Sequence, residues 1–323
     1  MQTRYKATVV IPTKNAGPLF ETVLNQVLLQ ETKWPFEVLV VDSGSSDKTL
    51  SVVGEHSAVR LIEILPTEFG HGKTRNFAID NANGEFIAMI TQDAIPINRD
   101  WLAEMVYVME QDPNIAGVFG RHIAHSDASL FTENELEQHF LGFKAQPIVE
   151  LDDPIRYIKD QGYRQFLYFF SDNNALIRRS IWEKIPYPEV DFAEDQAWAR
   201  LIIEAGYRKA YAHNAVVAHS HNYGFIERLQ RSFDEGYALQ RIFGFGGELI
   251  FLNAMKSFLA ITRRDLVVAM KSRDSKKVDI KNLIRMPLDN LMRILGSYLG
   301  AHGKSIPHML RLCLSRDKKL MKM

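Results

Sequence analysis

Three short apolar runs, each rich in β-branched residues and each followed at once by polar residues, constrain what this chain can fold into. They lie at residues 7–12, 36–42 and 85–90, and amphipathic stretches with helical spacing separate them. Short buried strands that alternate with helices become parallel neighbours in one sheet, joined by right-handed crossovers. The pattern therefore predicts an α/β domain with a mostly parallel, doubly wound sheet.

The pattern loosens after the third run, and the later elements rest on weaker signals. Residues 115–123 predict a strand, and SDNNALIRRSIWEKI at 171–185 predicts a turn into a helix. A further helix at 192–207 ends at Gly206, and the strand after it ends near two histidines. From Phe225 onward the spacing is helical, with predicted breaks at 244–247, 272–277, Pro287 and Pro307. We therefore divide the chain into an α/β domain at 1–224 and a helical region at 225–323.

Composition limits the setting in which the chain works. Cys313 is the only cysteine, which excludes an intramolecular disulfide and a cysteine-based zinc site. The first residues lack the pattern of a secretion signal, and no run of 18 or more apolar residues occurs. We expect a cytoplasmic protein.

The net charge is zero, but the charges are unevenly distributed. Residues 1–255 carry 23 Lys and Arg against 34 Asp and Glu, whereas residues 256–323 carry 16 against 5. A basic region of this kind favours an interaction with phosphate-bearing partners such as a membrane, and a merely solvated face is the alternative. Because the rest of the chain is acidic and no recognition motif occurs, we expect no nucleic-acid partner.

Polar residues follow the predicted parallel strands, at the edge where an open α/β sheet binds its ligands. Asp42 can accept a hydrogen bond from the imide of uracil or thymine, and Arg75 can reach ribose or diphosphate. Taken singly, Asp42 could cap a turn and Arg75 could be a surface charge. The chain has neither GxGxxG nor GxxxxGK[ST], which disfavours dinucleotide redox chemistry and P-loop phosphoryl transfer. The predicted crevice contains Pro12, Thr13, Asp42, Ser43, Lys73 and Arg75.

Two further groups could bind a metal ion. Asp93 follows the strand at 85–90, and one such carboxylate suffices for Mg²⁺ when a diphosphate and water supply the other oxygens. His219 and His221 alternate along a predicted strand, so both imidazoles lie on one face. The spacing allows joint metal contact, and it equally allows one buried ligand and one surface histidine.

Acidic and amide residues lie at the start of two of the predicted helices, those at 171–185 and 192–207. Glu194 and Asp195 stand in a first helical turn, where acids complement the helix dipole, or where one of them acts as a general base. Asp172 and Asn174 either cap the predicted helix that starts near Ala175 or bind sugar hydroxyls.

Taken together, these residues resemble a known family. The successive motifs of family 2 glycosyltransferases, inverting enzymes with the GT-A fold, are similar to six segments within residues 7–223. TQDA, SDNNALIRRSIW and the late HSH are similar to bacterial rhamnosyltransferases that use dTDP-L-rhamnose. The six segments are VVIPTKN (9–15), VLVVDSGSSDKT (38–49), GKTRNFAI (72–79), ITQDAIP (90–96), FFSDNNALIRRSIWEKI (169–185) and FAEDQAW (192–198).

The resemblance implies a role for each matched residue. Asp42 reads the nucleotide base, Arg75 contacts the nucleotide, and Asp195 is the catalytic base. Asp93 matches the second acid of a pair that holds Mg²⁺ or Mn²⁺, and His219 or His221 resembles a further metal ligand. Thr91 departs from the family, because the first acid of that pair usually stands there. The remaining expected contacts are Thr13 and Gln92 with the nucleotide and Asp172, Asn174 and Glu194 with sugar or acceptor.

The implied activity is metal-dependent, inverting transfer of L-rhamnose from dTDP-L-rhamnose to a hydroxyl of a bacterial surface glycan such as O-antigen. The alternatives are a UDP- or GDP-sugar donor, and a catalytically silent module that binds a nucleotide sugar. A nucleotidyltransferase would need a basic, glycine-rich loop after the first strand, and PTKNAGP fits this poorly.

The helical region has two interpretations. Its amphipathic, cationic segments suit the anionic inner face of the plasma membrane, where a lipid-linked acceptor would be held. A module for homo-oligomerisation or for packing is the alternative.

Overall fold

The computed structural model describes residues 5–247, 250–272 and 280–321. The chain forms two compact units. The first comprises Met1–His125, Gln138–Val190 and Glu194–His219, and the second comprises Ser126–Glu137, Asp191–Ala193 and Ser220–Met323. The sequence placed a domain boundary at 224/225, and nothing in it pointed to the two short stretches at 126–137 and 191–193.

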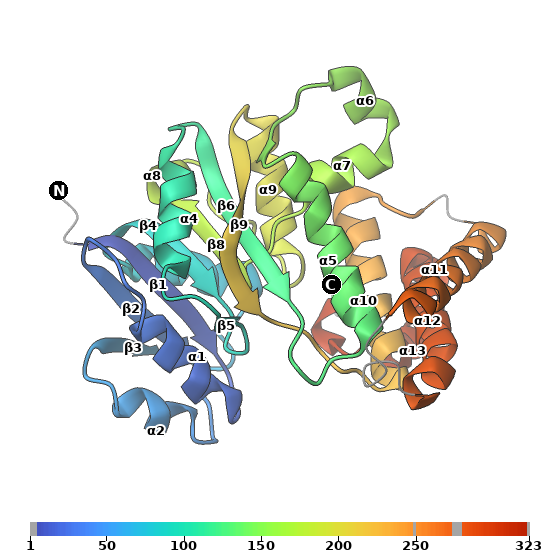
Figure 1. Cartoon of the computed structure of the whole chain (residues 1–323), viewed down its shortest axis with the longest axis horizontal. Coiled ribbons are helices and arrows are strands. Elements are labelled where there is room, and N and C mark those ends of the chain that lie inside the picture. Colours follow the sequence, from blue (N-terminus) through green and yellow to red (C-terminus); the bar gives the residue numbers. More distant parts are fainter. Residues whose placement is uncertain (1–4, 248–249, 273–279, 322–323) are drawn as a thin grey trace. The chain divides into compact units, whose positions relative to one another are not determined.

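The first unit is built on a mixed, mostly parallel sheet, which confirms the predicted α/β class (Figure 1). Its order among the described residues is β3-β2-β1-β4-β8-β6-β9-β5, and β7 pairs with β9. The first four strands are parallel neighbours; three of them, β1, β2 and β4, correspond to the apolar runs from which parallel strands were predicted, and β3 adds a fourth. They are β1 (Tyr5–Thr13), β2 (Phe36–Asp42), β3 (Val59–Glu63) and β4 (Gly84–Ile90), connected through α1 (Leu19–Leu28), α2 (Thr49–Gly54) and α3 (His71–Asn81).

The second half of the sheet contains the antiparallel strands. β8 (Asn174–Arg178) runs antiparallel to both β4 and β6 (Ile115–Ile123), so the prediction of a helix at 171–185 is wrong for most of its length. Only α8 (Arg179–Trp182) is helical there. The other elements are β5 (Ile95–Pro96), α4 (Trp101–Glu110), α5 (Leu130–Ala145), β7 (Ile148–Val149), α6 (Pro154–Lys159), α7 (Gln161–Tyr168), α9 (Glu194–Glu204) and β9 (Arg208–Ala218).

The core explains why the central strands are continuous apolar runs. Val9, Val40 and Phe86 are buried between helices packed on the sheet, and Phe20 of α1 and Trp101 of α4 belong to the same cluster. Fully burying a side chain of this size stabilises the fold by about 1.5–3 kcal/mol. The strands are therefore fixed along their length, and their polar ends have defined positions.

The second unit is helical, as predicted from Phe225 onward (Figure 1). Pro287 lies inside α12, so the predicted break there is wrong, whereas Pro307 does separate two helices. The predicted turn at 272–277 falls almost wholly outside the described residues. The helices are α10 (Phe225–Phe243), α11 (Phe251–Lys271), α12 (Ile280–Ala301) and α13 (His308–Leu314), with 3-10 turns η1 (Gly303–Ser305) and η2 (Lys318–Met321).

Helices α10 and α12 pack at close range. A Cβ on Gly300 would lie 2.2 Å from the carbonyl oxygen of Phe233, and one on Gly296 would lie 2.3 Å from that of Leu229. Only glycine permits this approach. No helix of the described residues is long and apolar enough to cross a membrane.

Candidate active site

The ends of β1 and β2 hold the residues predicted to bind the nucleotide. Thr13 and Asp42 are register partners, and the Thr13 hydroxyl donates to Asp42 Oδ2 over 2.9 Å. Ser43 donates its hydroxyl to the Thr13 carbonyl, and Pro12 precedes Thr13 on β1. The structure therefore brings Pro12, Thr13, Asp42 and Ser43 together at one edge of the sheet.

The Asp42 carboxylate is fully buried and organises the loop that follows it. Its Oδ1 accepts from the amides of Gly44 and Ser45, and its Oδ2 accepts from the hydroxyls of Thr13 and Ser45. A carboxylate offers about four acceptor positions, so these four donors occupy it. A base that binds Asp42 must therefore displace one of them, and the Ser45 hydroxyl is the one that can rotate.

Lys14, which the sequence did not single out, connects this edge to the loop after β4. Its Nζ donates to the carbonyls of Ser43 and Gly44 over 2.9 and 2.7 Å. Its backbone amide donates to Gln92 Oε1 over 2.9 Å. Lys14 thus places Gln92 beside the ends of β1 and β2, and the predicted contact of Gln92 with the nucleotide stays a prediction. Lys73 stands in the first turn of α3 and is exposed.

Asp93 and His219 meet because the strands next to them pair. Asp93 precedes β5 and His219 follows β9, and Ile95 pairs with Ala218. His219 Nε2 lies 3.6 Å from Asp93 Oδ1. Both histidines of the HSH motif lie beyond β9, so the expectation that they share one face of a strand is wrong. His221 stands two residues further along the chain and belongs to the second unit.

The surroundings of Asp93 fit a hard divalent cation. The Thr91 hydroxyl is buried and has no hydrogen-bond partner in the described part of the chain, so it can bind a metal-bound water. The Asn173 amide lies 3.4 Å from His219 Nδ1, and an amide oxygen turned to that nitrogen would place the ring proton on Nδ1 and make Nε2 the unprotonated, metal-binding nitrogen. Burial lowers the pKa of the adjacent His122 well below its usual value, so this ring adds no positive charge.

A second polar group lies around the start of α9. Arg75 is 8% exposed, and its Nε lies 2.6 Å from Asp172 Oδ2 while its Nη1 lies 2.7 Å from Glu194 Oε1. Asp195 joins through its Oδ2, which accepts from the Asp172 amide over 3.3 Å. Three carboxylates therefore gather around one guanidinium. The predicted contact of Arg75 with the nucleotide stays a prediction, and the contacts that the structure shows are with acids.

This crowding raises the affinity of Asp195 and Asp172 for protons. Burial raises the pKa of Asp195 well above its usual value, and the charges of Glu194 and Asp172 raise it further. Burial likewise raises the pKa of Asp172 to about 6, although Arg75 opposes the shift. Carboxyl groups that titrate nearer neutrality are suited to take up a proton during a reaction.

The start of α9 is held by features that no sequence pattern revealed. Tyr187 donates its hydroxyl to Asp172 Oδ1 over 2.7 Å. Ala193, just before Glu194, has a φ of 53°, which strains a residue with a Cβ. Gly72 packs against Pro188. A Cβ on Gly72 would lie 2.0 Å from the Pro188 carbonyl oxygen, and this close contact fixes the start of α3. Long-range packing therefore sets the positions of Arg75 and Asp195.

Asn174 has a structural role. It is fully buried, its Oδ1 accepts from the Trp101 indole, and its Nδ2 donates to the carbonyls of Arg121 and Ala215. The contacts that the structure shows for this side chain are all internal, and the predicted sugar contact stays a prediction. Asn173, its neighbour, faces His219 instead.

Comparison with known proteins identifies the fold and the family. The structure resembles a mannosyltransferase from Pyrobaculum calidifontis in complex with GDP-Man and Mn²⁺, with a TM-score of 0.58 and 20% identity, over 94% of this chain and 87% of that one. It also resembles residues 1–349 of TarS from S. aureus in complex with UDP-GlcNAc, with a TM-score of 0.52 and 17% identity, over 93% of this chain and 91% of that one. At such identities the likeness concerns the fold alone.

Sequence comparison goes further. The chain is 34% identical to the O-antigen chain rhamnosyltransferase RfbN of Salmonella typhimurium, over 94% of this chain and 91% of that protein. It is 32% identical to the O-antigen chain rhamnosyltransferase WbaN of Salmonella anatum, over 93% and 90%. The model of the family described as glycosyl transferase family 2 matches residues 8–185. The chain is therefore a glycosyltransferase with the GT-A fold and belongs to family 2.

Proposed function

We propose that the chain transfers L-rhamnose from dTDP-L-rhamnose to a hydroxyl of an O-antigen-type glycan, with inversion at the anomeric carbon. RfbN and WbaN, which each align over more than nine tenths of the chain, are named O-antigen chain rhamnosyltransferases, which supports the sugar and the acceptor class. The observation that carries the catalytic assignment is the raised pKa of Asp195 within the buried acid cluster.

Asp195 acts as the general base. Its carboxylate takes the proton of the acceptor hydroxyl as that oxygen attacks the anomeric carbon from the face opposite the diphosphate. The new C–O bond forms while the bond to the diphosphate breaks, and dTDP leaves. Glu194 and Asp172 raise the proton affinity of Asp195, while Arg75 and Tyr187 hold Asp172 in place.

The donor nucleotide lies at the ends of β1 and β2 in this proposal. Asp42 accepts the imide N–H of the base once the Ser45 hydroxyl turns away, and Thr13 and Ser43 flank it. Gln92, held by Lys14, and the exposed Lys73 contact the ribose and diphosphate.

The donor complex also contains a metal ion in this proposal. Asp93 and His219 of the first unit would hold the ion, and His221, two residues further along the chain, stays a predicted ligand. Mg²⁺ or Mn²⁺ bound there would stabilise the negative charge that develops on the departing diphosphate. The unpartnered Thr91 hydroxyl takes the place of a second acid by ordering a water molecule.

A donor screen tests the proposed activity. The full chain is incubated with dTDP-, UDP- and GDP-sugars and Mn²⁺, and released nucleotide and transferred sugar are measured by mass spectrometry. We expect release of dTDP from dTDP-rhamnose to exceed release from the other donors. Preferential use of a UDP- or GDP-sugar would contradict the donor assignment, and binding without turnover of any donor would indicate a silent module.

Replacing Asp93 by Ala should remove the metal dependence of nucleotide binding. We expect the Kd for dTDP measured calorimetrically with MnCl₂ to rise at least about tenfold, because a metal ligand is lost. The Kd in EDTA should stay unchanged. Asp100→Ala is the matched control, since Asp100 is an exposed carboxylate at the start of α4. An Asp93→Ala protein that still binds dTDP more tightly with Mn²⁺ than with EDTA would rule out Asp93 as a ligand.

We also propose that α11 binds the anionic inner face of the membrane, where a lipid-linked acceptor would lie. Apolar and basic residues alternate along one exposed stripe of this helix, at spacings of four and three. Leu259 and Met270 are 62% and 84% exposed, and Lys256 and Arg263 lie between the apolar residues. Repeated cations within the stripe would repel those of a second copy, whereas they favour anionic lipid. The stripe consists of Leu252, Lys256, Leu259, Arg263, Leu266 and Met270.

Vesicle flotation tests this surface. We expect the full chain to float with vesicles that contain phosphatidylglycerol and to remain in the bottom fraction when the vesicles are purely zwitterionic. Leu259→Ser should reduce flotation severalfold, because each buried CH₂ contributes about 0.8 kcal/mol. Ile158→Ser is the control, since Ile158 of the first unit is 76% exposed. A stable dimer in light scattering that Leu259→Ser dissociates, without flotation, would show that the stripe binds a second copy.

A further inference from the structure

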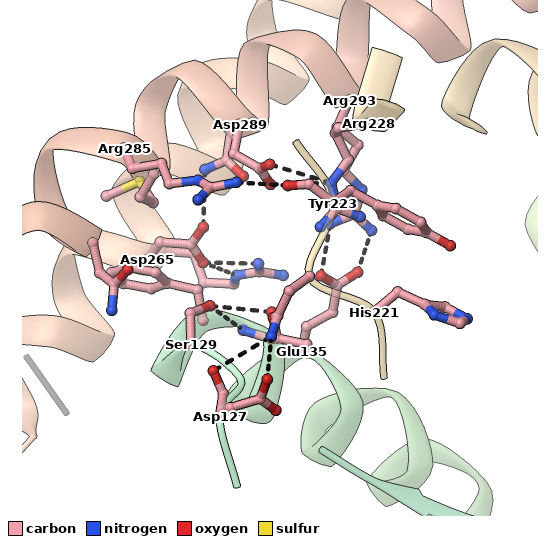
Figure 2. A pocket seen from close by; sticks show the side chains of 17 residues that line it. Asp127, Ser129, Glu135, His221, Tyr223, Arg228, Asp265, Arg285, Asp289 and Arg293 are labelled. Carbon is pink, nitrogen blue, oxygen red and sulfur yellow. Dashed lines mark hydrogen bonds and ion pairs between the residues drawn. The ribbon is translucent and has the colours of Figure 1, made fainter. Parts of the chain in front are cut away.

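The second unit contains a polar cavity of about 250 Å³, and all the residues that line it belong to that unit. Its walls come from residues 127–135, from the segment 221–223, and from α10, α11 and α12 (Figure 2). Pockets that bind drug-sized molecules have volumes of about 300 Å³ or more, so this cavity suits one small ligand or one residue of a larger one.

The cavity wall is charged, and most of its charges are paired. Figure 2 shows Arg293 facing Glu135, with Nη1 at 2.7 Å from Oε2, and Arg228 facing Asp289 at 3.2 Å. Arg285 donates to the Tyr223 carbonyl over 2.6 Å. Arg228, Arg264, Arg285 and Arg293 line the cavity together with Asp127, Glu135, Asp265 and Asp289, so its formal charge is zero.

A buried carboxylate fixes one side of the cavity. Asp265 of α11 is 1% exposed, and its Oδ2 accepts from Asn290 of α12 over 2.9 Å, while its Oδ1 accepts from Arg264. A buried charge is tolerated only when it is paired and hydrogen-bonded, and replacement by apolar residues is often neutral or stabilising. Stability alone therefore does not explain why this cavity is polar.

The carboxylates of the cavity act as hydrogen-bond acceptors. Burial would raise the pKa of Glu135, but Arg293 together with the charges of Arg264 and Arg228 lowers it below its usual value. A phosphate group would meet four carboxylates, and its attraction to the arginines would be offset. A neutral polyol meets no such repulsion, since its hydroxyls donate to carboxylates and accept from guanidinium groups.

Two further features favour a sugar. The amide of Asn282 in the first turn of α12 lines the cavity, and no hydrogen bond of this side chain occurs within the described ranges. Phe131 and Tyr223 add aromatic surface to the wall, against which the C–H face of a sugar ring can pack. A second hollow of about 540 Å³ shares His221, Asn222 and Tyr223 with the first, so that a chain of sugars could continue into it.

We propose that this cavity binds one uncharged sugar residue of the glycan that the enzyme elongates. The proposal rests on the proposed function for the acceptor class only, and it requires neither a particular donor nor a metal. It gives the second unit a part in acceptor recognition.

Saturation-transfer NMR with the full chain tests the proposal, with methyl glycosides of L-rhamnose, D-galactose and D-mannose as probes and no donor present. We expect saturation transfer to at least one glycoside. Asn282→Trp, which fills the cavity, should weaken that binding at least about tenfold, equivalent to about 1.4 kcal/mol. Asp289→Asn, which keeps the side-chain shape and removes one acceptor charge, should weaken it as well. Asn253→Trp, at an exposed position of α11, should bind as the wild type does.

Several results would overturn the proposal. One is the absence of saturation transfer to any glycoside. A second is glycoside binding that both Asn282→Trp and Asp289→Asn retain, when the thermal midpoints of both variants match that of the wild type. A third is displacement of the glycoside by inorganic pyrophosphate. A failed donor screen would leave glycoside binding unaffected, whereas a failed glycoside test would leave release of dTDP from dTDP-rhamnose unaffected. The two proposals can therefore fail separately.

Discussion

Asp195→Asn should lower the turnover number for sugar transfer by about 10²–10⁴-fold, the range typical for the loss of a general base. The amide has nearly the same shape as the carboxylate, and its one oxygen can keep the 2.8 Å hydrogen bond from the Gln196 backbone amide while the longer bond from Asp172 is lost, so the start of α9 should keep its structure. It cannot take up the acceptor proton. Binding of dTDP, measured by calorimetry, should stay within about twofold of the wild type, because Asp195 belongs to the acid cluster and not to the residues assigned to the nucleotide.

A matched control separates the loss of the base from a general effect on this segment. Asp191→Asn makes the same chemical change four residues earlier, at a partly exposed position for which no role is proposed. It should retain wild-type turnover. Asp195→Asn with near-wild-type turnover would refute the assignment of the base, and loss of dTDP binding in that variant would show that the structure of the site had changed.

The same assignment fixes the direction of the pH dependence. Asp195 must be ionised to accept a proton, and burial and neighbouring acids raise its pKa well above the usual value. The rate of sugar transfer should therefore rise with pH, and the midpoint of this rise should lie above the ordinary carboxylate pKa of about 4. Asp172, with its pKa raised to about 6, titrates in the same cluster. The rise in rate therefore reports the titration of the whole cluster and not of Asp195 alone.

The sequence predicted those parts of the site that depend on strand order. Thr13 and Asp42 end adjacent parallel strands, so apolar patterning alone places them side by side. Asp93 was placed at a strand end for the same reason. Its proximity to His219 depends on pairing between β5 and β9, which lie more than 110 residues apart in the chain and leave no local signal.

Where the sequence interpretation was wrong, tertiary contacts had overridden local preference. Residues 175–177 form a short apolar run that is compatible with either a helix or a buried strand, and packing between β4 and β6 selects the strand. Asn174 is a polar residue in that strand, and its three internal hydrogen bonds explain why it is buried. Pro287 is accommodated inside α12, where close packing of that helix on α10 stabilises the helical conformation.

Arg75→Met should destabilise the first unit, in a way that depends on pH. Removing the guanidinium leaves the buried Asp172 and Glu194 without their cation, and breaking a buried ion pair in this way typically costs about 3–5 kcal/mol. The cost falls when the acids are protonated. Because the pKa of Asp172 is already raised to about 6 and the loss of Arg75 raises it further, the Asp172 carboxyl is largely neutral near pH 5 and more often ionised near pH 8.

The free energy of unfolding of Arg75→Met should therefore fall below that of the wild type by more at pH 8 than at pH 5. Urea unfolding followed through the fluorescence of buried Trp198 and Trp182 in the first unit measures this difference. Lys73→Met on the same helix is the matched control, since Lys73 is exposed, and its stability should change by less than about 0.5 kcal/mol at either pH. An equal loss at both pH values would mean that Arg75 stabilises the site by packing alone. The ionisation of Asp172 and Asp195 would then have to depend on groups other than Arg75.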